Sequence, residues 1–309
     1  MIAFLFPGQG SQKVGMGRAL ADAFPEARAT FDEADAACPG LSDLIFGGPE
    51  ETLTLTENTQ PAILAMSIAA YRVLEARGIR PAFVAGHSLG EYSANVAAGT
   101  FAFADAVRIV RRRGRYMQEA VPVGHGAMAA ILGLDADLVR QACEEAAQGD
   151  VVSPANINGA GQVVIAGTVA AVARASERAK ALGARRAIPL PVSAPFHCAL
   201  MKPAEERLAP ELRALAVTDP RVPIVANVDA LPKRDAHGAI EALVRQVSSP
   251  VRWEEVVRRL ASEGVSTYVE VGPGAVLSGL VRKIHKDASV FNVAVPDDLA
   301  AVDAAMATN

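Results

Sequence analysis

The sequence predicts an α/β protein with a mostly parallel sheet and a smaller ferredoxin-like unit inserted into it. Three observations predict this fold. Short apolar runs typical of buried strands alternate with longer helix-forming runs along most of the chain. One strand-to-helix turn carries a serine between two glycines, and from about residue 124 to residue 191 the order changes to β-α-β-β-α-β. A chain of 309 residues is long enough for one large domain with a small insert.

Composition narrows the class of protein. The chain is 51% hydrophobic and 21% charged, which is typical of a globular protein, and its net charge of -4 argues against nucleic acid as a partner. Cys38, Cys143 and Cys198 are too few and too scattered for a disulfide framework or a zinc site, so we expect no metal. No apolar run approaches membrane-spanning length, and residues 1–8 lack the basic leader of a signal peptide. We therefore expect a cytoplasmic protein.

The N-terminal third begins with a buried strand at residues 2–6 and a glycine loop at 7–12. The loop lacks the lysine and the glycine spacing of nucleotide-binding motifs, so presenting a backbone N–H to an oxyanion is the better interpretation. Helix-forming sequence follows at 16–24, and Thr59-Gln60-Pro61 predicts a buried helix that Gly78 closes. A strand at 81–84 and a helix at 91–98, closed by Gly99, complete this part.

Gly86, Ser88 and Gly90 form the Gly-x-Ser-x-Gly pattern of a nucleophile elbow. The turn is sharp and its backbone strained, so the residues two before and two after the serine must lack a Cβ. The serine hydroxyl then lies at a helix N-terminus, where free N–H groups stabilise an oxyanion. The alternative interpretation is that the pattern occurs by chance, because the chain has 25 glycines. The pattern indicates acyl chemistry but no particular substrate.

A helix predicted at residues 103–119 is rich in arginine. The usual interpretation of such a run is a solvated face, and for most of these residues we adopt it. If the site takes an acidic acyl group, one of these arginines should instead bind the carboxylate of that group, because a guanidinium binds a carboxylate through two parallel hydrogen bonds. The candidates are Arg108, Arg111, Arg112, Arg113 and Arg115.

The inserted unit divides the chain into two predicted domains. A catalytic domain comprises residues 1–123 and 192–309, and a ferredoxin-like subdomain comprises residues 124–191. Within the insert we expect strands at 127–132, 151–156, 162–166 and 185–190, and helices at 135–149 and 168–182. Beyond it we expect strands at 222–227, 266–271 and 290–294, and helices at 239–247, 253–262 and from the Gly272-Pro273-Gly274 turn to about 284.

A serine nucleophile needs a general base, and the chain offers five histidines. His87 adjoins the serine and points the wrong way, while His237 and His285 lie in polar, exposed surroundings. His125 lies at the insert boundary. His197 follows a rigid Pro-Phe pair where the chain returns from the insert, which makes it the best candidate. A lone histidine is more often structural than catalytic, so spacing alone leaves both roles open for it.

Eight motifs, in order along nearly the whole chain, resemble the malonyl-CoA:acyl carrier protein transacylase family. They are Phe-Pro-Gly-Gln-Gly-Ser-Gln at 6–12, Thr-Gln-Pro at 59–61, Gly-His-Ser-Leu-Gly-Glu-Tyr at 86–92, Arg-Gly-Arg-Tyr-Met-Gln at 113–118, Asn-Ile-Asn at 156–158, Pro-Phe-His at 195–197, Gln-Val-Ser-Ser-Pro-Val-Arg-Trp at 246–253 and Glu-Val-Gly-Pro-Gly at 270–274. The resemblance implies a hydrolase-like α/β core with a ferredoxin-like insert. One departure is Cys198, where the family usually has serine, and we attribute it to local packing.

The resemblance also implies roles for single residues. Ser88 is the nucleophile, His197 its general base, and Gln246 orients His197 through a main-chain carbonyl. The backbone N–H groups of Gln9 and Leu89 form the oxyanion hole.

The remaining implied roles concern the substrate. Arg113 binds the free carboxylate of the malonyl group, and Met117, Asn158 and Phe196 belong to the same substrate site. Phe196, bulky beside the histidine, is expected to favour malonyl over methylmalonyl by crowding.

The implied activity is malonyl transfer from malonyl-CoA to the phosphopantetheine thiol of acyl carrier protein, through a malonyl-serine, in fatty acid synthesis. It needs no cofactor beyond the CoA thioester substrate, and we expect a monomer. Four alternatives stay open: a serine esterase or thioesterase, a non-catalytic carrier-binding scaffold, a malonyl loader for a polyketide synthase, and a malonate decarboxylase subunit. An esterase should have a late histidine, an acid before it and His-Gly-Gly-Gly, and the chain shows none of these clearly.

Overall fold

The larger of two sheets forms the centre of the computed structural model, which describes residues 1–192 and 194–307. Within these residues six strands run in the order β10-β9-β1-β2-β7-β8. All neighbours are parallel except β8, which is antiparallel to β7, so the predicted mostly parallel sheet is confirmed. Ser193 and the last two residues of the predicted catalytic domain lie outside the described residues. The strands are β1 (Ile2–Phe6), β2 (Phe83–Gly86), β7 (Ile224–Val225), β8 (Pro232–Lys233), β9 (Thr267–Val271) and β10 (Ser289–Val293).

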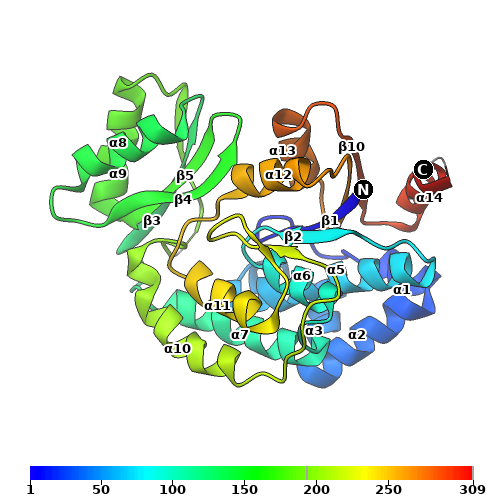
Figure 1. Cartoon of the computed structure of the whole chain (residues 1–309). Helices are drawn as coiled ribbons and strands as arrows, with labels where there is room; N and C mark the ends of the chain where they lie inside the picture. The colour runs from blue at the N-terminus through cyan, green and yellow to red at the C-terminus, as the bar shows by residue number, and fades with distance from the viewer. Residues whose placement is uncertain (193, 308–309) are drawn as a thin grey trace.

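Helices cover both faces of this sheet (Figure 1). Alternate residues of β1 point to opposite faces: Phe4 and Phe6 join one hydrophobic cluster, whereas Ala3 and Leu5 join another that contains Trp253. Burial on both faces explains why the strands are continuous apolar runs. The first cluster includes α5 (Thr56–Ala76), α6 (Gly90–Ala98) and α7 (Phe103–Glu119), and the second includes α12 (Trp253–Ser262) and α13 (Val276–Ile284).

The smaller sheet is antiparallel, with strand order β4-β5-β3-β6, and lies at the upper left of Figure 1. The predicted β-α-β-β-α-β order is confirmed, while the exact domain boundaries stay a prediction. One face packs against two helices, and the other packs against Cys198 and Phe196. The small sheet thus supports the segment that carries His197. Its elements are β3 (Gly126–Leu132), α8 (Ala136–Ala147), β4 (Val152–Gly159), β5 (Gln162–Thr168), α9 (Val169–Ala181) and β6 (Arg186–Pro189).

Several helices were not predicted from the sequence. Those between residues 25 and 58 are missing from the prediction because their starts carry little signal: α3 follows Gly40 and α4 follows Pro49, neither with a side-chain cap. The helix predicted at 16–24 is α1 and ends at Ala23. The helices whose bounds have not yet been given, whether predicted or not, are α1 (Arg18–Ala23), α2 (Pro25–Ala37), α3 (Leu41–Gly47), α4 (Glu50–Leu53), α10 (Lys202–Arg213), α11 (Ala236–Gln246) and α14 (Leu299–Ala307). There are also 3₁₀ turns at Ala199–Met201 and Pro296–Asp298.

Three predicted boundaries near the site were wrong. The helix predicted to open at Thr59-Gln60-Pro61 is α5, which begins earlier, at Thr56, so Pro61 lies inside it. Strand β2 begins at Phe83 and extends to Gly86, because Gly86 pairs with Phe6. Strand β7 has only two residues, since the N–H of Asn227 donates to a side chain and not to a neighbouring strand.

No helix in the described part of the chain is both long enough and apolar enough to span a membrane.

Candidate active site

The predicted nucleophile elbow is present where β2 ends and α6 begins. Ser88 has a φ of 52°, a left-handed conformation that a serine rarely adopts. A Cβ on Gly86 would lie 1.9 Å from the carbonyl carbon of Gly90, and one on Gly90 would lie 2.0 Å from the carbonyl oxygen of Phe6. Both glycines are therefore required by close backbone contact.

A methyl group at Gly90 is expected to destabilise the fold. Because both clashing groups are backbone, neither can move aside alone, and Gly90→Ala should lower the free energy of unfolding by about 3 kcal/mol or more. Urea unfolding measures this. Gly279→Ala is the matched control: Gly279 lies inside α13 with no atom within 4 Å of the new Cβ. There, alanine should leave stability unchanged or raise it by about 0.5–1 kcal/mol. Equal losses in both variants would contradict the steric account.

Ser88, His197 and Gln246 form a hydrogen-bonded chain. The Nδ1 of His197 lies 3.0 Å from the main-chain oxygen of Gln246, and its Nε2 lies 2.7 Å from the Oγ of Ser88. A carbonyl oxygen only accepts, so Nδ1 carries the proton and Nε2 is free to accept the hydroxyl proton of Ser88. Burial, together with the charge of Arg113, lowers the pKa of His197 to about 3. Near neutral pH the imidazole is therefore uncharged, the form required of a base.

Arg113 is buried beside the nucleophile, with only 1% of its surface exposed. Its Nη1 donates to Oε1 of Gln60 at 2.8 Å, and its Nη2 donates to Oγ of Ser88 at 3.1 Å and to Oε1 of Gln246 at 2.9 Å. Among the described residues no carboxylate lies within 4.0 Å of it, and its Nε has no hydrogen-bond partner. Burial lowers the pKa of this guanidinium. The other arginines of α7 are exposed, as predicted for a solvated face.

Two polar residues that the sequence analysis left without a role complete the network. The Oδ1 of Asn227 accepts from the N–H of Ser88 at 2.8 Å, and its Nδ2 donates to the oxygen of Gly86 at 2.7 Å. Glu91 is 1% exposed, and its Oε2 accepts from the N–H of Asn227 at 3.0 Å and from Nε2 of Gln246 at 2.8 Å. Burial raises the pKa of Glu91 to about 7. A charged residue in the apolar stretch 90–98 was the one local signal of this network.

One of the two residues expected to supply an oxyanion hole lies in the loop after β1, and the other directly follows Ser88 in the elbow. Gln9 is exposed in the loop after β1, and its Nε2 donates to Oγ1 of Thr56 at 3.3 Å. Leu89 is buried at the start of α6. Within the described part of the chain, neither main-chain N–H donates to a protein acceptor. Both are therefore available to a ligand.

The other predicted substrate residues contact the site indirectly or not at all. The sulfur of Met117 lies 4.0 Å from Nε2 of Gln60, the residue that also binds Arg113. The Oδ1 of Asn158 lies 2.9 Å from Nε2 of His87, the residue before Ser88. Phe196 is half-buried between the small sheet and the main core.

The remaining histidines are not near the nucleophile. His125 and His237 are exposed, as expected for His237. His285 is half-buried and contacts the hydroxyl of Tyr268 at 3.0 Å, so its predicted exposure was wrong. Cys198 is buried against the small sheet, where its thiol donates to the oxygen of Pro195 at 3.1 Å, in agreement with a packing role.

A parallel sheet with a Ser-His pair at a nucleophile elbow defines an α/β enzyme of the acyl-transferring class. A family model described as "Acyl transferase domain" matches residues 3–298. The chain belongs to the malonyl CoA-acyl carrier protein transacylase family, and it is an acyltransferase.

Relatives and solved structures match over almost the whole chain. The malonyl CoA-acyl carrier protein transacylase of Bacillus subtilis is 52% identical over 300 residues, covering 96% of this chain and 95% of the relative. An acyl carrier protein S-malonyltransferase from Vibrio cholerae has a TM-score of 0.96 at 48% identity, covering 97% and 99%. A malonyl-transacylase solved in complex with a type II PKS acyl-carrier protein has a TM-score of 0.94 at 49% identity, covering 97% of each chain.

Proposed function

We propose that this enzyme transfers a malonyl group from malonyl-CoA to the phosphopantetheine thiol of an acyl carrier protein, through a malonyl ester of Ser88. One observation carries the proposal: Arg113 is buried within hydrogen-bond distance of the nucleophile, and no carboxylate among the described residues pairs with it. A buried cation left unpaired is costly, so the site favours an acyl group that supplies a carboxylate. Relatives at about half identity that are named for malonyl transfer support the same substrate.

The first half-reaction acylates the enzyme. The Oγ of Ser88 gives its proton to Nε2 of His197 and attacks the thioester carbonyl carbon, which forms a C–O bond. The resulting oxyanion accepts hydrogen bonds from the main-chain N–H groups of Gln9 and Leu89. When the C–S bond breaks, the CoA thiolate leaves and takes the proton from His197. Gln246 keeps the imidazole in the tautomer that both proton transfers need.

The second half-reaction repeats these steps with a new thiol. The phosphopantetheine thiol gives its proton to His197 and attacks the malonyl ester, and the oxyanion forms in the same hole. The Ser88 oxygen then leaves and recovers its proton from His197. Every group in both steps is a side chain, a main-chain amide or a substrate, and we propose that no metal or cofactor takes part beyond the CoA thioester.

Acyl selectivity is assigned to the residues around Arg113. The guanidinium holds the free carboxylate, and Met117 helps to place it through their shared partner Gln60. Phe196 crowds the position next to the thioester carbonyl, where methylmalonyl carries an extra methyl group. Asn158 acts through His87, which it holds beside the nucleophile.

A side-chain change at Gln9 is expected to have little effect on transfer. The proposed donor is the main-chain N–H, which Gln9→Ala retains, whereas loss of an oxyanion donor costs roughly 100- to 1000-fold in kcat. We expect Gln9→Ala to keep kcat within about tenfold of the wild type, because only the 3.3 Å contact with Thr56 is lost. Steady-state transfer to carrier protein measures this. A folded Gln9→Ala protein without activity would refute the backbone assignment.

The carrier is proposed to be that of fatty acid synthesis, with the enzyme acting as a cytoplasmic monomer that binds no nucleic acid. A polyketide carrier is a second candidate, favoured by the relative solved with a type II PKS acyl-carrier protein. We further propose that residues 124–191 form a subdomain of their own.

A transfer assay tests the proposed function. Wild-type enzyme is mixed with malonyl-CoA and holo carrier protein, and the carrier is followed by mass. The proposal predicts a malonyl-carrier product and no transfer to carrier that lacks its phosphopantetheine. Release of free malonate at the same rate with or without carrier would instead identify a thioesterase.

A further inference from the structure

The side chain of Gln246 joins the nucleophile, the arginine and Glu91, although the mechanism above uses only its main-chain oxygen. Resting on the proposed function, we propose that Glu91 is a positioning residue for acyl selectivity: its carboxylate holds the Gln246 amide so that the amide oxygen keeps Arg113 facing the acyl group.

The orientation of the Gln246 amide follows from its neighbours. Its Nε2 faces Oε2 of Glu91 at 2.8 Å and the main-chain oxygen of Ser88 at 2.9 Å, and both are acceptors. Its Oε1 faces Nη2 of Arg113 at 2.9 Å, and a guanidinium only donates. A rotated amide would place NH₂ against the guanidinium and oxygen against two acceptors. Glu91 therefore stabilises the orientation in which the amide oxygen of Gln246 accepts from Nη2 of Arg113.

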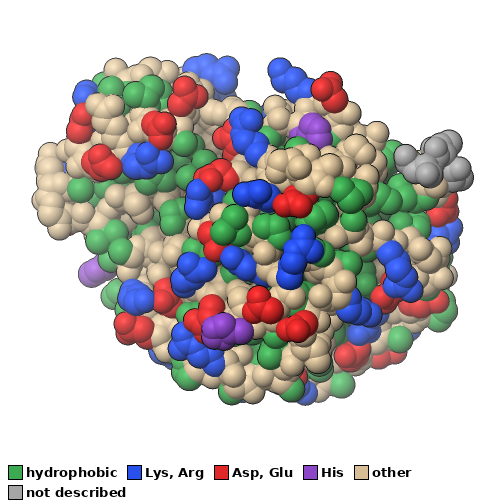
Figure 2. Space-filling model, viewed as in Figure 1, with side chains coloured by type: hydrophobic (Ala, Val, Ile, Leu, Met, Phe, Trp, Pro, Cys, Tyr) green, Lys and Arg blue, Asp and Glu red, His purple; other side chains and the backbone are tan. Residues whose placement is uncertain are grey.

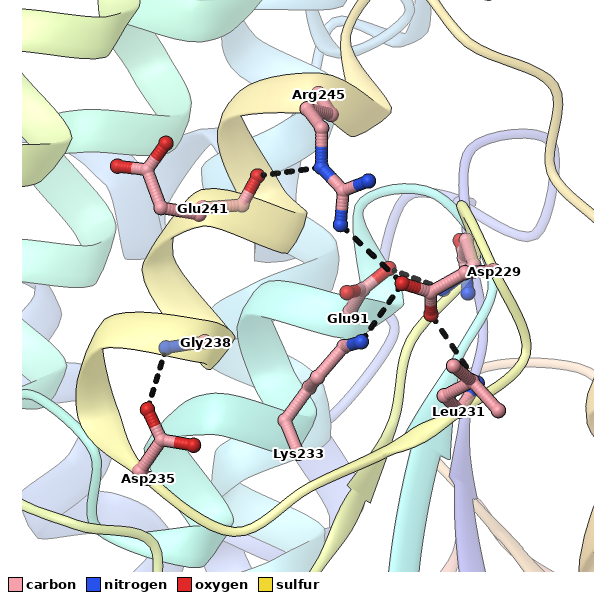
Figure 3. Close-up of polar contacts among 9 residues, drawn as sticks. Glu91, Asp229, Leu231, Lys233, Asp235, Gly238, Glu241 and Arg245 are labelled. Atoms are coloured by element: carbon pink, nitrogen blue, oxygen red, sulfur yellow. Dashed lines mark hydrogen bonds and ion pairs between the residues drawn. The ribbon is translucent and has the colours of Figure 1, made fainter.

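Glu91 makes these contacts without a cation of its own. Among the described residues no lysine, arginine or histidine lies within 4.0 Å of its carboxylate. The two cations nearby, Lys233 and Arg245, bind Asp229 at 2.7 and 3.2 Å, as Figure 3 shows. The buried carboxylate of Glu91 is therefore stabilised by the N–H groups that donate to it and not by an ion pair. The acceptor capacity of Glu91 is instead directed at Gln246 and at Asn227, which holds the N–H of Ser88.

This arrangement distinguishes positioning from simple structural support. If Glu91 positions Arg113, its loss should lower the kcat/KM for acyl groups that carry a carboxylate more than the kcat/KM for acyl groups that do not. If Glu91 only supports the elbow, its loss should slow both alike. The readout is therefore the ratio of kcat/KM for malonyl-CoA to that for acetyl-CoA.

Two substitutions separate shape from hydrogen bonding. Glu91→Met has a similar length but no strong acceptor, and it should lower the malonyl-to-acetyl ratio by about tenfold, the effect of one hydrogen bond to a charged group. Glu91→Gln keeps an oxygen that can accept from Gln246 and Asn227, and it should stay within about threefold of the wild-type ratio.

The experiment measures acyl-enzyme formation from each CoA ester for the wild type and the variants. Glu270→Gln is the matched control, because Glu270 is another fully buried carboxylate whose partners are the N–H groups of Leu277 and Ser278, away from the site. Its malonyl-to-acetyl ratio should be that of the wild type. If Glu91→Met fails to fold, Glu91→Asp replaces it, since the shorter side chain withdraws the carboxylate and should also lower the ratio.

The outcomes test the positioning role of Glu91 and the proposed function separately. A ratio lowered in Glu91→Met or Glu91→Asp and retained in Glu91→Gln supports the positioning role. An unchanged ratio in a folded Glu91→Met or Glu91→Asp protein, or a ratio lowered equally by Glu270→Gln, overturns it. A wild-type enzyme that forms no malonyl adduct overturns the proposed function itself.

Discussion

Replacing Ser88 by alanine is expected to lower malonyl transfer by on the order of 10⁶-fold, the effect of removing a nucleophile that acts as a unit with its base. The hydroxyl oxygen lies 2.7 Å from Nε2 of His197, and alanine has no group that can take its place as nucleophile. Stability should change little, because an alanine at this φ of 52° is no more strained than the serine. The measurement is kcat for transfer, with circular dichroism to verify the fold.

The transfer activity that remains in Ser88→Ala distinguishes a covalent mechanism from direct attack by the carrier thiol. Activity near the wild-type level in folded Ser88→Ala would mean that the thiol attacks the CoA thioester directly, without a covalent intermediate. His197→Ala should show a loss similar in size, since nucleophile and base act together.

Replacing Arg113 by alanine is expected to change which acyl group is used. The guanidinium is buried, and in the described part of the chain no carboxylate lies within 4.0 Å of it, so its pairing with a substrate carboxylate contributes roughly 3–5 kcal/mol. The kcat/KM for malonyl-CoA should fall by about 150- to 5000-fold. Acetyl-CoA should be used better than by the wild type, because an uncharged acyl group no longer leaves a buried cation unpaired. Kinetics with both CoA esters measure the change.

Arg108→Ala is the matched control for this prediction. Arg108 lies on the same helix but is exposed, with its Nη1 3.1 Å from Asp105, so both rates should stay near those of the wild type. Arg113→Lys keeps the charge but not the two-pronged donor, and it should recover part of the malonyl rate. An unchanged malonyl-to-acetyl ratio in Arg113→Ala would contradict the assigned role.

The fold was predictable where local signals were strong. Helix α7 was predicted at its observed bounds, where its apolar residues recur with helical spacing, and α6 ends at Ala98, directly before the predicted Gly99, which has a left-handed conformation. The start of α5 and the short β7 were not predictable, because contacts from elsewhere in the chain set them. The N–H of Asn227, for instance, is held by Glu91, which is 136 residues away in the sequence.

The site, like the fold, was predictable only where the signal came from residues that are neighbours in the sequence. The elbow pattern identified Ser88 from neighbouring residues alone. The choice of Arg113 among the arginines of α7 came from the family resemblance, since burial of a single arginine depends on packing against α5 and α6. Asn227 gave no sequence signal of its role, and Glu91 gave only that of a charged residue within the stretch 90–98, because each acts through partners 136 to 155 residues away in the chain.

The most direct test of the central claim is the intact mass of the enzyme after brief mixing with equimolar malonyl-CoA and acetyl-CoA, followed by a chase with holo acyl carrier protein. We predict a malonyl adduct on the wild type and none on Ser88→Ala, discharged faster by carrier protein than by water. An adduct lost at one rate with or without carrier, or no adduct at all, would contradict a malonyl-serine transferase.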